Sequence, residues 1–156
     1  MVILRKAVPG LREGPLARFV ARARRRLKLD GTVNVLVTSS RELRALNRRF
    51  RSLDKPTDVL SFPCIPGLSD GLAGDIAISA DIAAHNARQL GHSPAEEIRI
   101  LVLHGLLHLA GFDHERDRGE MAKKEDALRQ SLRLPCGLID RDGVPAKRAG
   151  NSRSTR

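Results

Sequence analysis

The fold of this chain is decided by residues 93–114, SPAEEIRILVLHGLLHLAGFDH. Ser93, followed by a proline and two glutamates, is typical of a helix start, because serine caps free N–H groups and acids favour the positive end of the helix dipole. From Ile98 onward the run is apolar on almost every side, which predicts a central, buried helix that ends at Ala110. Gly111 then supplies the residue type that most easily adopts a positive φ just past a helix end.

Three of the five histidines of the chain lie within the last eleven residues of this stretch. His104 and His108 are four residues apart, so a helix places both imidazoles on one face, about 6 Å apart along its axis. A turn at Gly111 can then bring back His114 as a third ligand. Three protein ligands, with the fourth position left to water, are typical of a catalytic zinc site. The spacing therefore predicts one zinc ion per chain, bound by His104, His108 and His114.

Length and composition favour a soluble single domain. A chain of 156 residues is long enough for one real core, and with four Phe and no Trp or Tyr that core must be mainly aliphatic. No apolar run approaches the roughly 18 residues of a membrane helix, and charge follows the first four residues, so we expect no signal peptide and a cytoplasmic protein. Cys64 and Cys136 lack a CxxC spacing and are expected to be free thiols.

The net charge of +10 is concentrated at the two ends of the chain. Residues 1–28 hold nine Lys and Arg against one acid, and residues 141–156 hold five against one. Such basic ends are typical of proteins that contact nucleic acid or an anionic surface, but a solvated helix face with a soluble tail explains them equally well. We predict one domain over residues 1–140 and a disordered tail over residues 141–156.

Hydrophobic periodicity predicts helices and strands that alternate along the chain. The expected strands are 2–5, 32–38, 57–62 and 74–79. The expected helices are 15–27, one that opens at Ser39 or Ser40, 80–90, 93–110 and 115–133. Prolines bracket 57–62, which places that strand near a sheet edge, and the Pro and Gly content of 63–74 predicts a loop. The fold class is therefore α/β (α+β): a small, mixed four-stranded sheet covered by about five helices, with the central buried helix carrying the metal ligands.

The helix that opens at Ser39 or Ser40 has two stripes of side chains. We expect an apolar stripe of Leu43, Leu46 and Phe50 to be buried. A separate basic stripe is formed by Arg41, Arg44, Arg48 and Arg51.

The histidine spacing HxxxHxxGxxH matches the zinc signature of the metzincin proteases, with one difference. Those enzymes carry a glutamate after the first histidine as general base, and this chain has Gly105 there. The motif thus predicts the metal site and argues against peptide hydrolysis.

Three ordered motifs resemble those of the YbeY family of endoribonucleases: LNRRFRSLDKPTDVLSFP at 46–63, GDIAIS at 74–79 and HGLLHLAGFDH at 104–114. The resemblance implies a single-domain α/β fold, one zinc ion on three histidines and single-stranded RNA as substrate. It also implies processing of small-subunit ribosomal RNA and ribosome quality control in a bacterium, with components of the small ribosomal subunit as partners. No membrane partner is expected.

The resemblance also implies roles for individual residues. His104, His108 and His114 match the family's ligands, and Arg51 matches its functional arginine. Arginine suits this role because its planar fork holds phosphoryl oxygens while charge builds on them. We therefore predict that Arg51 and His114 are catalytic and that Arg44, Arg48 and Arg51 bind RNA.

Two other functions stay open at this point, a zinc peptidase and a non-catalytic ribosome-assembly factor whose structural zinc would need a fourth ligand. Asp113 either orients a ligand imidazole or stabilises a turn. Asp58 and Asp75 are weaker candidates for the site, and His85 and His92 are expected on the surface. The sequence does not identify a general base.

Overall fold

The structure, a computed structural model, describes residues 1–64 and 71–135. The predicted tail at 141–156 and Cys136 lie outside these residues. No helix in the described part is long and apolar enough to cross a membrane. The elements in chain order are β1 (Val2–Leu4), α1 (Glu13–Arg26), β2 (Thr32–Thr38), α2 (Ser40–Arg51), β3 (Val59–Pro63), β4 (Leu72–Ser79), α3 (Ala80–Leu90), α4 (Pro94–Leu109) and α5 (Glu120–Ser131).

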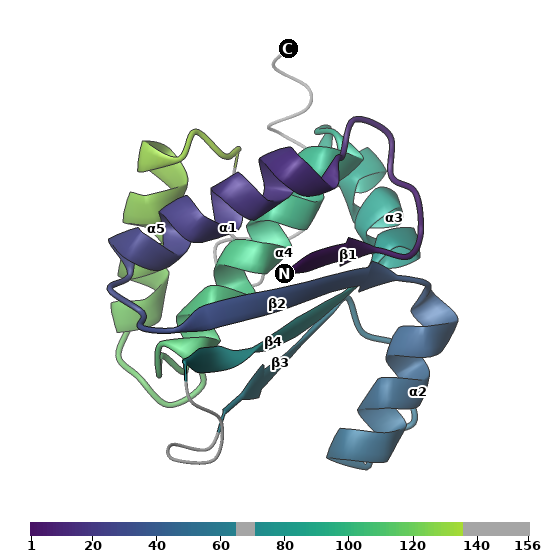
Figure 1. Ribbon diagram of the computed structural model, residues 1–156, viewed down its shortest axis with the longest axis horizontal. Helices are drawn as coiled ribbons and strands as arrows, with labels where there is room; N and C mark the ends of the chain where they lie inside the picture. Colours follow the sequence, from purple (N-terminus) through teal and green to yellow (C-terminus); the bar gives the residue numbers. More distant parts are fainter. Residues whose placement is uncertain (65–70, 136–156) are drawn as a thin grey trace.

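The four strands form one mixed sheet in the order β1-β2-β4-β3. Strands β1, β2 and β4 are parallel, and β3 runs antiparallel to β4 at the edge. Figure 1 shows α1, α3, α4 and α5 on one side of the sheet and α2 on the other. The predicted α/β class, the four-stranded mixed sheet and the edge position of the strand before Pro63 are confirmed.

Helix α4 is the centre of the core, and it packs against β3, β4 and the helices α1, α3 and α5 (Figure 1). Ser93 caps its first turn: the serine Oγ accepts from Glu96 N at 3.1 Å, and the Glu96 carboxylate accepts from Ser93 N at 2.9 Å. Gly111 has a φ of 98°, so the chain reverses as soon as the helix ends. The predicted buried helix and both of its end signals are confirmed.

Gly105 lets α4 lie close to the sheet. A Cβ added there would come within 3.0 Å of Ile76 Cδ1 and 3.1 Å of both Ile76 Cγ atoms. Ile76, in β4, is 1% exposed, so it has no solvent into which it can move. A side chain at position 105 would therefore collide with the sheet.

Helix α2 packs on the other face of the sheet and is most deeply buried in its first half. Leu43 is fully buried against Leu60 and Ala77, Leu46 is half-buried, and Phe50 is 58% exposed. The prediction that Phe50 is buried was wrong. These three residues share one stripe of α2, but burial declines toward the end of the helix.

Several predicted boundaries differ from the observed ones, and hydrogen bonds explain two of the differences. Helix α5 begins at Glu120 rather than at 115. The Asp117 carboxylate accepts from Gly119 N and Met121 N, both at 2.9 Å, so Asp117 forms a turn before the helix and bonds to an N–H group of its first turn. Strand β4 begins at Leu72, inside the predicted loop, because the β3–β4 pairing extends to a bond from Cys64 N to Ala73 O. The rest of that loop, 65–70, lies outside the described residues.

His92 is buried, against the expectation of a surface position, whereas His85 is exposed as predicted. The His92 side chain is 6% exposed, and its Nε2 lies 2.6 Å from Oε1 of the fully buried Glu97. A carboxylate in the apolar core needs a polar partner, and His92 supplies one.

Candidate metal centre

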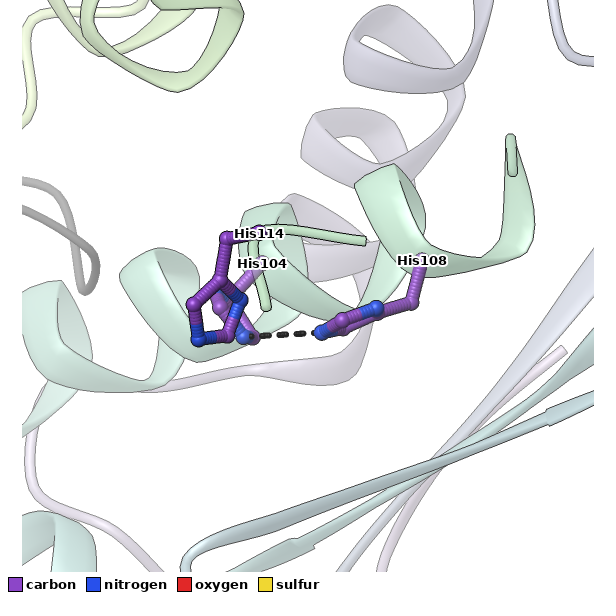
Figure 2. Close-up of side chains that lie close together, drawn as sticks. All are labelled: His104, His108 and His114. Atoms are coloured by element: carbon purple, nitrogen blue, oxygen red, sulfur yellow. Dashed lines mark hydrogen bonds between the residues drawn. The ribbon is translucent and has the colours of Figure 1, made fainter. Parts of the chain in front are cut away.

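Two elements bring the three histidines together. Helix α4 presents His104 and His108 on one face, and the segment after the Gly111 turn carries His114 back over them (Figure 2). The Nε2 atoms of His104 and His108 are 3.1 Å apart. One ring nitrogen from each of the three histidines lies within 4.8 Å of the other two.

Hydrogen bonds behind the rings fix the orientation of two imidazoles. His104 Nδ1 lies 3.2 Å from the Glu125 carboxylate, which is buried, and His108 Nδ1 lies 3.0 Å from the carbonyl oxygen of Phe112. With Nδ1–H donating in each ring, the lone pair of Nε2 points toward the centre of the cluster. This is the arrangement in which outer partners commonly hold metal-binding histidines.

The histidine cluster fits a metal ion. Zn–N bonds of about 2.0–2.1 Å place tetrahedral ligand atoms about 3.3–3.4 Å apart, close to the observed Nε2 separation of 3.1 Å. The Nδ1 atom of His114 is buried and has no hydrogen-bond partner in the described part of the chain. Burial first, and then the nearby His104, lower the pKa of His108, which favours the neutral imidazole that a metal requires.

The cluster opens into a cleft of about 520 Å³ between α4, β3 and the end of α2. Arg51 lines this cleft together with His104 and His108, and it donates from Nη2 to the Ser61 carbonyl at 2.6 Å. Among the predicted RNA-binding arginines, Arg44 and Arg48 are exposed outside the cleft, and Arg44 is paired with Asp54 at 2.9 Å. The structure thus brings Arg51 alone of the basic stripe to the histidines.

Sequence reasoning missed Glu125. The residue lies on the apolar stripe of α5, between the buried Met121 and Leu128, and it is 1% exposed. An acid in an apolar stripe is the signal that could have identified it, because a buried carboxylate must have a polar partner.

Asp113, the candidate for orienting an imidazole, instead stabilises a turn. Its Oδ1 accepts from Glu115 N at 3.1 Å, and its Oδ2 lies 3.4 Å from Arg116 Nε. Asp75 lies on the sheet face opposite α4 and accepts from Asn34 Nδ2 at 3.0 Å, while the Asp58 carbonyl accepts from Ser79 N.

The geometry also bears on the two alternative functions. Position 105, where a protease carries its glutamate, faces Ile76 in the sheet and not the cleft. Cys64 is a free thiol and does not belong to the histidine cluster, and within residues 1–64 and 71–135 no other cysteine or carboxylate joins it. Within the described residues, the candidate metal ligands are therefore the three histidines.

Comparison with known proteins identifies the family of the chain. A family model described as Endoribonuclease YbeY matches residues 16–133. Proteins named Endoribonuclease YbeY from Koribacter versatilis and Solibacter usitatus are 60% and 48% identical to the chain; the first match covers 96% of both chains, and the second covers 90% of this chain and 92% of the relative. The solution structure of a Thermotoga maritima protein superimposes with a TM-score of 0.57 at 30% identity, over 94% of this chain and 95% of the other. The chain therefore belongs to the YbeY family of endoribonucleases, which are RNA-cleaving hydrolases.

Proposed function

We propose that this protein is a zinc-dependent endoribonuclease that cleaves single-stranded regions of ribosomal RNA during maturation and quality control of the small ribosomal subunit. One arrangement carries the proposal: three imidazoles converge, and two of them, His104 and His108, line the same cleft as Arg51. We also place the reaction in the cytoplasm, because bacterial ribosomal RNA is processed there.

In this proposal His104, His108 and His114 hold the ion. When bound, zinc supplies a Lewis acid for a phosphoryl oxygen or lowers the pKa of a bound water. The buried Glu125 and the Phe112 carbonyl keep two of the imidazoles aimed at the ion, so little reorganisation is needed when the substrate arrives.

Arg51 binds the scissile phosphate. Its bond to the Ser61 carbonyl uses one of the five guanidinium N–H groups, and Ser61 is its one hydrogen-bond acceptor in the described residues. The remaining N–H groups are available to a non-bridging phosphoryl oxygen as negative charge grows there. The cleft, at about 520 Å³, falls within the usual size of a small-ligand site, about 300–1,000 Å³.

The test is cleavage of a labelled ribosomal RNA fragment that contains paired and unpaired segments. We expect cuts in the unpaired segments, loss of cutting with a chelator, recovery with zinc, and no cutting by His114→Ala. His85→Ala, which replaces an exposed histidine far along the chain from the cluster, is the matched control and should cut like the parent. Cleavage that persists in chelator and in His114→Ala would refute the proposal.

A further inference from the structure

A second hollow of about 500 Å³ lies on the sheet face opposite the histidine helix. Its apolar wall includes Phe50 from α2 and Phe62 from β3, whose rings meet edge-to-face with centroids 5.6 Å apart. Phe50 is one of the few large apolar residues in the described chain that are exposed. The exposed Phe50 ring and the half-buried Phe62 ring form an aromatic pair at the wall of a hollow, and clustered apolar side chains of this kind mark binding surfaces, whereas single exposed ones are ordinary.

Charge around this hollow is arranged for a nucleic acid. The Arg49 guanidinium carbon lies 5.2 Å from the centroid of the Phe50 ring, and that of Arg51 lies 5.8 Å from the Phe62 ring. Asp75, paired with Asn34, also lines the hollow. A carboxylate inside repels phosphate, whereas arginines beside the rings attract it, so the arrangement suits bases within and a phosphodiester backbone along the arginines.

The two hollows are both lined by residues of β3, at one edge of the sheet. Strand β3 is the edge strand, with Ser61 turned toward α4 and Phe62 turned toward the other face. Arg51 lies across this edge: it lines the histidine cleft, bonds to the Ser61 carbonyl and approaches the Phe62 ring. An extended strand held by Arg51 in the cleft can therefore continue over β3 onto the two phenylalanines.

We propose that the Phe50–Phe62 hollow is a base-stacking subsite for unpaired RNA nucleotides that adjoin the phosphate held by Arg51. This inference rests on the proposed function and extends it, because it assigns the single-strand preference to a place on the molecule. Stacking on an aromatic ring tolerates any base, since every base has a π-face, but it requires a base that is not engaged in a duplex.

The experiment is equilibrium binding of a short, fluorescein-labelled, single-stranded 2′-O-methyl RNA by the zinc-loaded protein. We expect Phe50→Leu, which keeps apolar surface and removes the ring, to bind about 5- to 150-fold more weakly, the range for loss of one stacked base. Phe50→Tyr keeps a ring and should bind like the parent. His85→Ala, which removes an exposed ring outside the hollow, should also bind like the parent.

Abasic sites placed one at a time along the RNA complete the test. At one position the abasic site should weaken binding to the parent by the same factor by which Phe50→Leu weakens binding to the intact RNA. On that abasic RNA, Phe50→Leu and the parent should bind with equal affinity. Phe50→Leu that binds intact RNA like the parent, with an unchanged melting temperature, overturns the inference. So does a concentration-dependent dimer in sedimentation that Phe50→Leu dissociates, because a second copy would then occupy the hollow.

The outcomes separate this inference from the proposed function. RNA binding that depends on Phe50 in a protein that does not cleave RNA would overturn the proposed function and leave the subsite standing. Zinc-dependent cleavage with RNA binding that is independent of Phe50 would overturn the subsite and support the proposed function.

Discussion

Replacing Gly105 with alanine tests whether close packing of α4 on the sheet holds the histidine cluster. A Cβ at this position meets three atoms of Ile76 at 3.0–3.1 Å, and because those atoms span both branches of the side chain, rotation about χ1 cannot clear them. Overpacking of this kind costs about 1–3 kcal/mol. The better helix propensity of alanine offsets about 0.8–1 kcal/mol of it. We expect the free energy of unfolding to fall by up to about 2 kcal/mol.

A double-mutant cycle with Ile76→Ala isolates the contact. Ile76→Ala alone should cost about 2–5 kcal/mol, as large-to-small core changes do. In that background the clash is gone, so Gly105→Ala should stabilise by up to about 1 kcal/mol. Gly14→Ala on the exposed side of α1, whose new Cβ would meet the flexible end of Arg18 at 3.6 Å, is the control without a core contact. It should be neutral or slightly destabilising, because Pro15 disfavours helical backbone for a preceding residue that has a Cβ.

Urea unfolding followed by circular dichroism gives all four free energies, and zinc content measured on the same samples links stability to the site. If the changes in free energy of unfolding of the two single variants add up to that of the double variant within about 0.5 kcal/mol, the packing argument is refuted, since independent sites behave that way. A shift of α4 should also weaken zinc binding in Gly105→Ala, because His104 is the preceding residue.

Three further outcomes follow from the contacts. His108→Ala should lose stoichiometric zinc in mass spectrometry. In the metal-free parent, where the pKa of His108 is lowered, the stabilising effect of the neutral imidazole should be full above about pH 6.5 and decline below it, because the unfolded chain takes up the proton first. Arg51→Lys should keep zinc but cut single-turnover cleavage at saturating RNA by about 10²–10³, whereas Arg48→Lys outside the cleft should cleave like the parent; equal rates for both would make Arg51 a binding residue only. Asp81→Asn should lower the melting temperature at pH 7, because Lys6 and Ser40 N hold the pKa of Asp81 down. The difference in melting temperature from the parent should vanish as pH falls below about 3.8, and a difference that does not change with pH would refute this role of Asp81.

Local signals were enough to predict the helix that carries the histidines. Ser93, Glu96 and Gly111 act within a few residues of themselves, and they produce the capping box and the reversing turn wherever the rest of the chain lies. The same holds for β2, where alternation alone separates the buried Val33, Val35 and Val37 from their neighbours.

Long-range contacts account for two of the errors. Phe50 carries the periodicity of a buried residue, but whether the sheet extends beneath it depends on how α2 crosses β3 and β4. The buried pair of Glu125 and His104 was missed for the same reason. The two residues are 21 positions apart in the chain, and the sequence around one does not indicate the other. Such pairs are visible in sequence only as a charge in an apolar stripe.

The position of Arg51 is an effect of β3 rather than of its own helix. Arg51 ends α2, which packs on the sheet face opposite α4, and helical geometry alone gives it no route to the histidines. Ser61 provides the route: its carbonyl accepts from Arg51, while its Oγ donates to the Gly105 carbonyl at 3.3 Å in α4. One residue of the edge strand therefore ties the guanidinium to the helix that bears His104 and His108. A cation held this way keeps its distance to the cluster before RNA binds, which is the preorganisation that electrostatic stabilisation of a growing phosphoryl charge requires.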